Sequence, residues 1–264
     1  MRITEVKAST ACSPSKLPGL DWALNPYRGC SHACVYCYSA DILRMAPTDK
    51  WGASLEVRKN LPVLLAKERK KKKGVIGLGT VTDPYQQVEE KTLLTRYCLE
   101  QLALGDSRVC IQTKSDLVTR DIDILARMNN PEVGITVTTM DAEMAAKLEP
   151  GAPPPDRRMA AVRKLVSAGI RTWVFLGPII PGMNDSYDSL AEVVRGAKIA
   201  GASKIIYDYL RLKPILQERM LKEFGYEKAH VAIRDSVDRE WRERVSIDVE
   251  ILCEEHGIAV EKVF

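Results

Sequence analysis

The chain has 264 residues, of which 45% are hydrophobic and 28% are charged, a balance typical of a globular protein with a conventional core. Its net charge of +4 permits a polyanionic partner without requiring one. No apolar run approaches the roughly 20 residues that a membrane-spanning helix needs, and the N-terminal residues lack the apolar segment of a secretory signal. We therefore expect a cytoplasmic protein without a membrane partner.

Short β-branched runs alternate with helical stretches along most of the chain. Strands are predicted just before Cys30 and at 74–79, 109–112, 134–138, 171–175 and 204–207, with helices at 88–104, 122–128, 142–148, 157–168 and 186–200. Alternation at this spacing indicates parallel strands joined by right-handed helical crossovers. Six such units are too few for an eightfold barrel. The prediction is an α/β fold, a partial (β/α)6 TIM-type barrel.

The last part of the chain has a different character. Beyond the final predicted strand the sequence is rich in charge, and its apolar residues have the spacing of amphipathic helices. We therefore expect residues 1–212 to form the barrel with its N-terminal segment. Residues 213–264 are expected to form a helical extension packed on the barrel.

Three of the seven cysteines lie close together, at Cys30, Cys34 and Cys37. An odd number of cysteines in a chain of this length disfavours a disulfide framework, so the clustered thiols indicate metal or redox chemistry. A Cys-x3-Cys-x2-Cys loop can give three thiolates to a four-iron cluster and leave one iron open for an exogenous chelating ligand. The alternative is a zinc site with His32 as its fourth ligand, although its place between two cysteines would strain such a tetrahedron.

The residues around these cysteines match a known sequence pattern. The segment NPYRGCSHACVYCY at 25–38 resembles the cluster motif of the radical S-adenosylmethionine superfamily, in its spore photoproduct lyase-like branch. Four further blocks resemble the same branch and follow in order: GTVTDPYQQVE at 79–89, TKSDLVTRDIDIL at 113–125, LEP at 148–150 and PIIPGMND at 178–185. Together the blocks cover most of the chain between about residues 20 and 212.

The resemblance implies a radical enzyme. A [4Fe-4S] cluster on Cys30, Cys34 and Cys37 would bind S-adenosylmethionine and cleave it to methionine and a 5′-deoxyadenosyl radical, which abstracts hydrogen from a substrate. An external one-electron reductant of the flavodoxin or ferredoxin type is implied as a partner. The substrate stays open between nucleic acid, as for the photoproduct lyase, and a peptide, protein or small metabolite. A non-catalytic iron–sulfur or zinc-binding protein is the alternative of another class.

The resemblance also suggests residues that bind the cofactor. Five of them lie in the matching blocks or on predicted strands: Tyr36, Tyr38, Thr82, Lys114 and Thr136. A sixth, Arg158, lies in the helix predicted at 157–168. Lys114 follows a predicted strand and is flanked by small polar residues, which favours a binding role over an ordinary surface position. Arg158 can pair either with a carboxylate of the cofactor or with Glu149, and the sequence leaves both partners open.

The hydrogen donor that would end the reaction is harder to predict. The photoproduct lyase uses a cysteine in the block that matches Thr80-Val81-Thr82, and no cysteine stands there in this chain. Cys98 and Cys110 are expected in the core of a helix and a strand. Cys12, in an N-terminal segment expected to be flexible, is then the favoured donor. Efficient photoproduct repair is not expected.

Overall fold

The computed structural model describes residues 1–44 and 51–263. The strands in these residues are β1 (Arg2–Val6), β2 (Ser13–Pro14), β3 (Trp22–Leu24), β4 (Tyr27–Arg28), β5 (Ser54–Arg58), β6 (Val75–Leu78), β7 (Arg108–Thr113), β8 (Glu132–Thr136), β9 (Arg171–Ile179), β10 (Lys204–Tyr209) and β11 (Ala259–Lys262). The helices are α1 (Ser39–Ile42), α2 (Leu61–Glu68), α3 (Glu89–Thr92), α4 (Leu94–Leu102), the 3-10 helix η1 (Asp116–Asp121), α5 (Ile122–Leu125), α6 (Ala142–Leu148), α7 (Pro155–Ser167), α8 (Tyr187–Ala200), α9 (Pro214–Asp235) and α10 (Arg239–Glu255).

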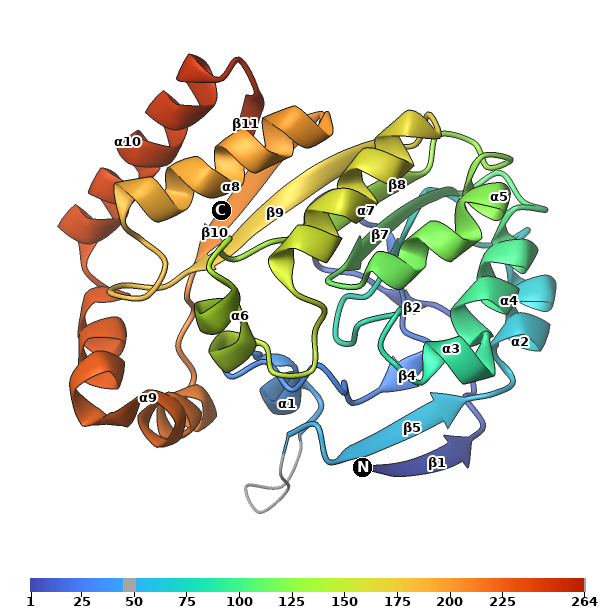
Figure 1. Ribbon diagram of the computed structural model, residues 1–264. Coiled ribbons are helices and arrows are strands. Elements are labelled where there is room, and N and C mark those ends of the chain that lie inside the picture. The colour runs from blue at the N-terminus through green and yellow to red at the C-terminus, as the bar shows by residue number, and fades with distance from the viewer. Residues whose placement is uncertain (45–50, 264) are drawn as a thin grey trace.

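A curved sheet forms the centre of the molecule, and helices cover its outer face (Figure 1). In the described residues its eight strands have the order β11-β10-β9-β8-β7-β6-β3-β2, and β2 alone runs antiparallel to its neighbour. Five of the six predicted strands correspond to β6 through β10. The first barrel strand is β3, which lies somewhat earlier than predicted, because the strand directly before Cys30 is β4 of another sheet. The six barrel strands lie side by side in this order. Parallel strands that follow one another through outer helices form a barrel wall. The predicted partial barrel is therefore confirmed.

The helices between the early strands are shorter than the sequence suggested. The helix expected over 88–104 is interrupted at Leu93, whose φ of 51° is left-handed and separates α3 from α4. The buried carboxylate of Glu89 accepts a hydrogen bond of 2.8 Å from the Thr95 amide, which satisfies a free donor at the start of α4. The helix expected over 122–128 ends at Leu125 and follows the 3-10 helix η1.

The C-terminal part contributes a strand in addition to its helices. Helices α9 and α10 agree with the predicted helical extension, but β11 then pairs in parallel with β10, with Lys204 opposite Ala259. The strand was not predicted because its side chains are all exposed and the segment is only four residues long. It extends the barrel wall at one edge of the sheet.

Side chains alternate along the strands between the helix-packed core and the barrel interior. On β7, Val109 and Ile111 are buried in the main core, whereas Cys110 and Gln112, which alternate with them, are less buried and border the barrel interior. On β8 and β9 the interior is partly filled by an aromatic ring, because a Cβ added at Gly134 would lie 2.3 Å from the Trp173 indole. The interior is therefore a shaped cavity.

A second sheet stands beside the barrel. It has the order β1-β5-β4, and the cysteine-rich loop leaves directly from β4. None of the helices in the described ranges is both long and apolar enough to cross a membrane.

Candidate active site

The three clustered cysteines lie on the loop between β4 and α1. The loop starts at Gly29, where φ is 93° and a Cβ would lie 2.5 Å from the Ser54 carbonyl oxygen, so this turn requires glycine. Cys30 and Cys34 are buried and Cys37 is partly exposed. All three border one cavity of about 520 Å³ that continues into the barrel interior. The loop therefore lies at the carboxyl ends of the barrel strands.

The block that follows β6 holds this loop in place. The Thr82 hydroxyl donates a hydrogen bond of 2.6 Å to the Gly29 carbonyl. The Gln86 amide donates to the Thr82 hydroxyl at 3.0 Å, and its carbonyl oxygen accepts from the Ser31 backbone at 2.7 Å. Thr82, predicted as a cofactor-binding residue, thus has its hydroxyl engaged with the loop.

The block at 148–150 supports the loop from another side. The Val35 amide donates a hydrogen bond of 2.9 Å to the Leu148 carbonyl, and the Gly151 amide donates one of 3.0 Å to the His32 carbonyl. A Cβ at Gly151 would lie 2.1 Å from the Ser31 carbonyl oxygen, so only glycine allows this close approach. The blocks that resemble the radical enzymes in sequence therefore meet around the three thiols.

Glu149, Arg158 and Lys114 form a buried charged network beside the cavity. Glu149 accepts a hydrogen bond from the Tyr36 hydroxyl and pairs with the Arg158 guanidinium at 2.5 Å. The Lys114 ammonium lies 4.0 Å from the same carboxylate and 5.5 Å from the centroid of the Tyr36 ring. Although burial alone would raise the pKa of Glu149, the charges of Arg158 and Lys114 hold that pKa below its ordinary value. The carboxylate is therefore ionised and fixes both cations.

Of the two partners that the sequence left open for Arg158, a cofactor carboxylate and Glu149, the structure shows Glu149. Arg158 is 1% exposed, and besides Glu149 it donates hydrogen bonds to the carbonyls of Pro153, at 2.7 Å, and Thr136, at 3.2 Å. It is not among the described residues that border the cavity. The structure places Arg158 behind Glu149, where it holds the carboxylate that faces Lys114.

The other predicted site residues come together. Those that border the cavity of the three thiols are Tyr36, Tyr38, Thr82, Lys114 and Thr136. Tyr38 is 42% exposed and its hydroxyl donates to the Thr80 carbonyl at 3.3 Å. Burial alone would lower the pKa of Lys114, but Cys34 and Glu149 raise that pKa above its ordinary value. Lys114 thus offers a permanent positive charge at the cavity wall.

Sequence reasoning did not identify the residues of the cavity's inner part. Gln112, Trp173, Phe175 and Asp208 border the cavity from β7, β9 and β10. The sequence did offer one signal for them. Side chains alternate between the two faces of a strand, so residues two positions apart share a face. That signal alone does not tell which face lines a cavity.

The imidazole of His32 contacts the carboxylate of Asp83 and not the three thiols. Its Nδ1 atom lies 3.3 Å from Asp83, which also accepts hydrogen bonds from the Thr113 hydroxyl at 2.6 Å and the Lys114 amide at 2.8 Å. Within residues 1–44 and 51–263, no three His, Cys, Asp or Glu side chains are gathered closely enough to hold a single metal ion. This arrangement does not support the zinc alternative with His32 as a ligand.

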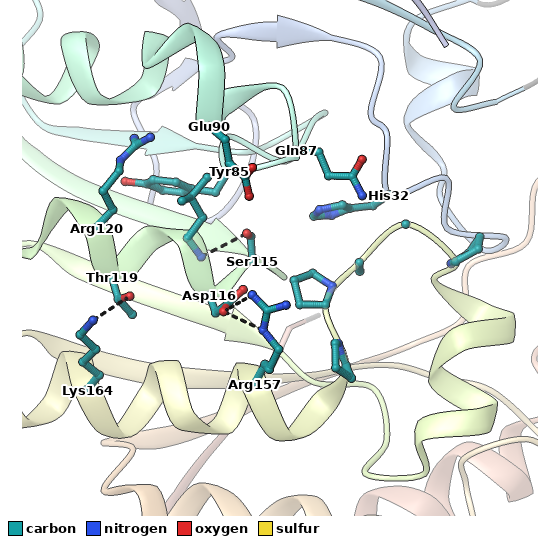
Figure 2. Close-up of a pocket in the computed structure, with 16 residues that line it drawn as sticks. His32, Tyr85, Gln87, Glu90, Ser115, Asp116, Thr119, Arg120, Arg157 and Lys164 are labelled. Atoms are coloured by element: carbon teal, nitrogen blue, oxygen red, sulfur yellow. Dashed lines mark hydrogen bonds and ion pairs between the residues drawn. The ribbon is translucent and has the colours of Figure 1, made fainter.

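His32 also borders a second pocket, of about 560 Å³, which the thiols do not line (Figure 2). Its charged side chains are largely paired across it: Arg157 binds Asp116 at 2.6 Å, and Lys164 lies 3.4 Å from the Thr119 hydroxyl. These contacts tie η1 to α7. The pocket therefore has a structural explanation that is separate from the thiol site.

The expected positions of the remaining thiols were partly wrong. Cys12 does not lie in a flexible segment: it is 2% exposed in the main core, because the Ala11 amide donates to Glu68 at 3.1 Å and draws the N-terminal segment onto α2. Cys98 is buried, as expected. Cys110 faces the barrel interior, and in the described residues it is the one thiol besides the three of the loop that borders the cavity.

The residues present fit an iron–sulfur cluster. Burial, with smaller contributions from Asp83 and Cys37, raises the pKa of the Cys30 thiol to about 12, so the protein alone favours the protonated form. Iron supplies the positive charge that displaces such protons when thiolates become ligands. The indole nitrogen of Trp51 and the Ser31 hydroxyl are buried without a hydrogen-bond partner in the described residues. Trp51 lies in the same apolar cluster as Cys30, so a bound iron–sulfur cluster would bring sulfur acceptors to the side of the loop where this indole lies.

Comparison with known proteins agrees with this chemistry. The family description "Radical SAM superfamily" matches residues 24–194. An uncharacterized protein of Methanocaldococcus jannaschii is 32% identical over 235 residues, which make up 88% of this chain and 87% of that protein.

Solved structures share the fold. Spore photoproduct lyase complexed with dinucleoside spore photoproduct has a TM-score of 0.76 at 17% identity, covering 99% of this chain and 82% of that chain. Streptococcus suis SuiB bound to S-adenosylmethionine has a TM-score of 0.62 at 14% identity, covering 91% of this chain and 49% of that chain. A second SuiB structure is bound to the precursor peptide SuiA. The family match spans well over half of the chain, so the resemblance in sequence is confirmed and the protein belongs to the radical SAM superfamily.

Proposed function

We propose that the protein cleaves S-adenosylmethionine reductively and uses the 5′-deoxyadenosyl radical to abstract hydrogen from a substrate inside the barrel. Superfamily membership implies an enzyme that uses S-adenosylmethionine and a [4Fe-4S] cluster. One observation carries the proposal: Cys30, Cys34 and Cys37 border the same cavity as Lys114 and the interior face of the strands. When bound, the cluster supplies the electron that breaks the carbon–sulfur bond of the cofactor.

The side chains of this protein bind and orient the cofactor. Lys114 offers an ammonium group to the cofactor's carboxylate, and Glu149 keeps that group at the cavity wall from 4.0 Å away. Tyr36, Tyr38 and Thr136 border the cavity beside it. In this assignment Arg158 does not touch the cofactor but positions Glu149, and Thr82 positions the cysteine loop.

The inner part of the cavity suits a small group of the substrate. Trp173, Phe175 and Ile206 give it an apolar wall, and Gln112 and Asp208 add polar atoms. A hollow of about 520 Å³ that also has to hold the cofactor admits a single side chain, a small metabolite or one extruded nucleotide.

The charges at the far end of the cavity are paired with each other. Arg108 binds Glu132 at 2.8 Å, and Lys204 pairs with Glu261. Because these two cations are already paired, they would contribute less to binding a phosphate backbone than free cations would. We therefore take a peptide, protein or small metabolite as the first substrate class to test. The electron donor in this proposal is an external one-electron protein of the flavodoxin or ferredoxin type.

Anaerobic reconstitution with iron and sulfide tests the cluster. We expect about four irons per chain and broad visible absorption, both lost in Cys34→Ala and both retained in the matched variant Cys110→Ala. With dithionite and S-adenosylmethionine, the loaded protein should release 5′-deoxyadenosine. Stoichiometric zinc without iron would refute the proposal. An iron-loaded protein that releases no 5′-deoxyadenosine would support the non-catalytic alternative.

The substrate class is tested by incubating the loaded enzyme with separate pools of peptides, metabolites, DNA and RNA, followed by untargeted mass spectrometry. We expect substrate-dependent stimulation of 5′-deoxyadenosine release by a peptide or metabolite pool. We also expect little repair of a spore photoproduct dinucleotide, because hydroxyl groups replace the donor thiol at Thr80 and Thr82 and hold their hydrogen atoms more strongly. Multiple-turnover repair would show that the nucleic-acid alternative is right.

A further inference from the structure

Helix α9 packs on the cysteine loop, although it lies outside the segment 24–194 that matches the family. Figure 1 shows α9 beside α1 at the end of the barrel where this loop lies. Ile215 of α9 packs against the apolar group that contains Cys30 and Trp51. Met220, five residues further on, is buried with Cys34. The C-terminal part of the chain therefore forms part of the surroundings of the thiols.

One cation on this helix faces the loop directly. The Arg219 guanidinium donates a hydrogen bond of 3.3 Å to the Cys37 carbonyl, and it lies 5.5 Å from the ring centroid of Trp51. Arg219 is partly buried, and across the described ranges it has no ion pair with a carboxylate. Its positive charge is thus held beside the thiols. The neighbouring Glu218 attracts this charge without forming an ion pair in the described residues.

The ring beneath Arg219 is itself part of this environment. Trp51 is 6% exposed and packs against Cys30, and its indole nitrogen has no hydrogen-bond partner among residues 1–44 and 51–263. An arginine held over a buried indole is fixed in place by a cation–π contact. The same ring keeps water from that side of the loop, so the field of the guanidinium is less screened than at an exposed surface.

We propose that Arg219, held over Trp51, stabilises the reduced form of the cluster and so helps set its reduction potential. The inference rests on the proposed function. Reduction transfers one electron from the external one-electron donor to the cluster and adds one negative charge next to three thiolates. A fixed cation nearby stabilises that added charge, and the potentials of such clusters depend on charge, hydrogen bonding and solvent exposure. Arg219 acts through the cluster's environment, as a positioning and tuning residue.

An equilibrium redox titration tests the proposal, with the reduced cluster measured by electron paramagnetic resonance and by bleaching of the visible absorption. At a fixed solution potential, Arg219→Gln should lower the ratio of reduced to oxidised cluster about tenfold, which corresponds to about 59 mV for a one-electron couple. Arg219→Lys keeps the charge and should stay within about threefold of wild type. Arg239→Gln is the matched control, because Arg239 is 90% exposed on α10, and it should leave the ratio unchanged.

Iron analysis separates the two proposals. A wild-type protein without a cluster would overturn both, whereas a loaded Arg219→Gln protein with an unchanged ratio would overturn only the role of Arg219. If Arg219→Gln fails to hold iron, Arg219→His replaces it, because pH then switches the charge within one folded protein. The ratio for Arg219→His should fall relative to wild type as the pH rises through the histidine pKa, near 6.5. A ratio that follows wild type across that range would refute the inference.

Discussion

Glu149→Gln removes the charge at the centre of the buried network and keeps the shape of the side chain. Glu149 and Arg158 are each 1% exposed, so the guanidinium of Arg158 would be left without a counter-charge in a dry environment. The two carbonyls that Arg158 also binds, those of Pro153 and Thr136, would still accept its hydrogen bonds. The substitution therefore isolates the loss of charge from the loss of packing.

The expected magnitude follows from these contacts. Breaking a buried ion pair by removing one partner costs about 3–5 kcal/mol. Since Arg158 keeps two carbonyl partners, we expect a loss near the lower end, about 3 kcal/mol in the free energy of unfolding. Glu143→Gln is the control on α6, the helix that ends just before Glu149. The Glu143 side chain is exposed, so the substitution should change stability by less than about 0.5 kcal/mol.

Urea denaturation under anaerobic conditions measures both variants through their midpoints and slopes. A double-mutant cycle with Arg158→Met gives the coupling, which should be about 1–3 kcal/mol because the two side chains touch. A Glu149→Gln protein as stable as Glu143→Gln, or additive with Arg158→Met, would refute the reasoning. Either result would mean that the pair does not hold the cavity wall.

The loss of stability caused by Glu149→Gln should depend on pH in a predictable direction. Burial alone would raise the pKa of Glu149, but Arg158 and Lys114 lower it beneath its ordinary value of 4.5. A carboxyl group with a lowered folded-state pKa stabilises the fold fully above its unfolded pKa, and this contribution is lost as the pH falls through the folded-state value. The difference between wild type and Glu149→Gln should therefore be constant from about pH 6 to 8 and shrink below about pH 4.5.

Three further predictions test the cavity. Lys114→Met should weaken S-adenosylmethionine binding ten- to a hundredfold in a calorimetric titration, since hydrogen bonds to charged groups contribute about 1.5–3 kcal/mol. A variant that loses iron but keeps its affinity for the cofactor would contradict the assignment of Lys114. Iodoacetamide should label Cys110 faster than Cys12, which is 2% exposed. The labelling rate of Cys110 should rise with pH, because burial raises the pKa of this thiol to about 11. Equal labelling rates, measured by peptide mass spectrometry, would place Cys12 outside the core. Gly134→Ala should destabilise the fold by about 1–3 kcal/mol, because the new Cβ would lie 2.3 Å from an indole ring. Gly105→Ala, whose nearest contact would be 3.5 Å, is its control, and equal denaturation midpoints would be the opposing result.

The parts of the site that could be predicted from the sequence are those fixed by local spacing or by the ends of parallel strands. Cys30, Cys34 and Cys37 share one short loop, so their common position follows from chain connectivity. Lys114 and Thr136 come from different strands, and the carboxyl ends of parallel strands meet at the same edge of a sheet. For that reason they border one cavity with the thiols.

What could not be predicted depends on contacts between distant segments. The interruption at Leu93 arises because the carboxylate of Glu89 binds the start of α4, and no local propensity indicates this. Cys12 is buried because the N-terminal segment packs on α2, a contact between residues 57 positions apart for the Ala11 amide and Glu68. The strand β11 forms only because the edge of β10 is available to it. Each of these outcomes is set by tertiary structure.

The cavity divides into two parts with different origins, and this division bears on the substrate. Its rim is built from the blocks that resemble the radical enzymes. The side chains of Thr82 and Gln86 and the backbone amide of Gly151, which follows one of these blocks, hold the cysteine loop. Its inner wall comes from alternate residues of the strands, such as Trp173 and Phe175, whose neighbours along the strand are buried beneath the helices. Because the two sets of side chains do not overlap, the inner wall can change while the cysteine loop stays in place. Under the proposed function, the rim would therefore carry the radical chemistry and the interior would select the substrate.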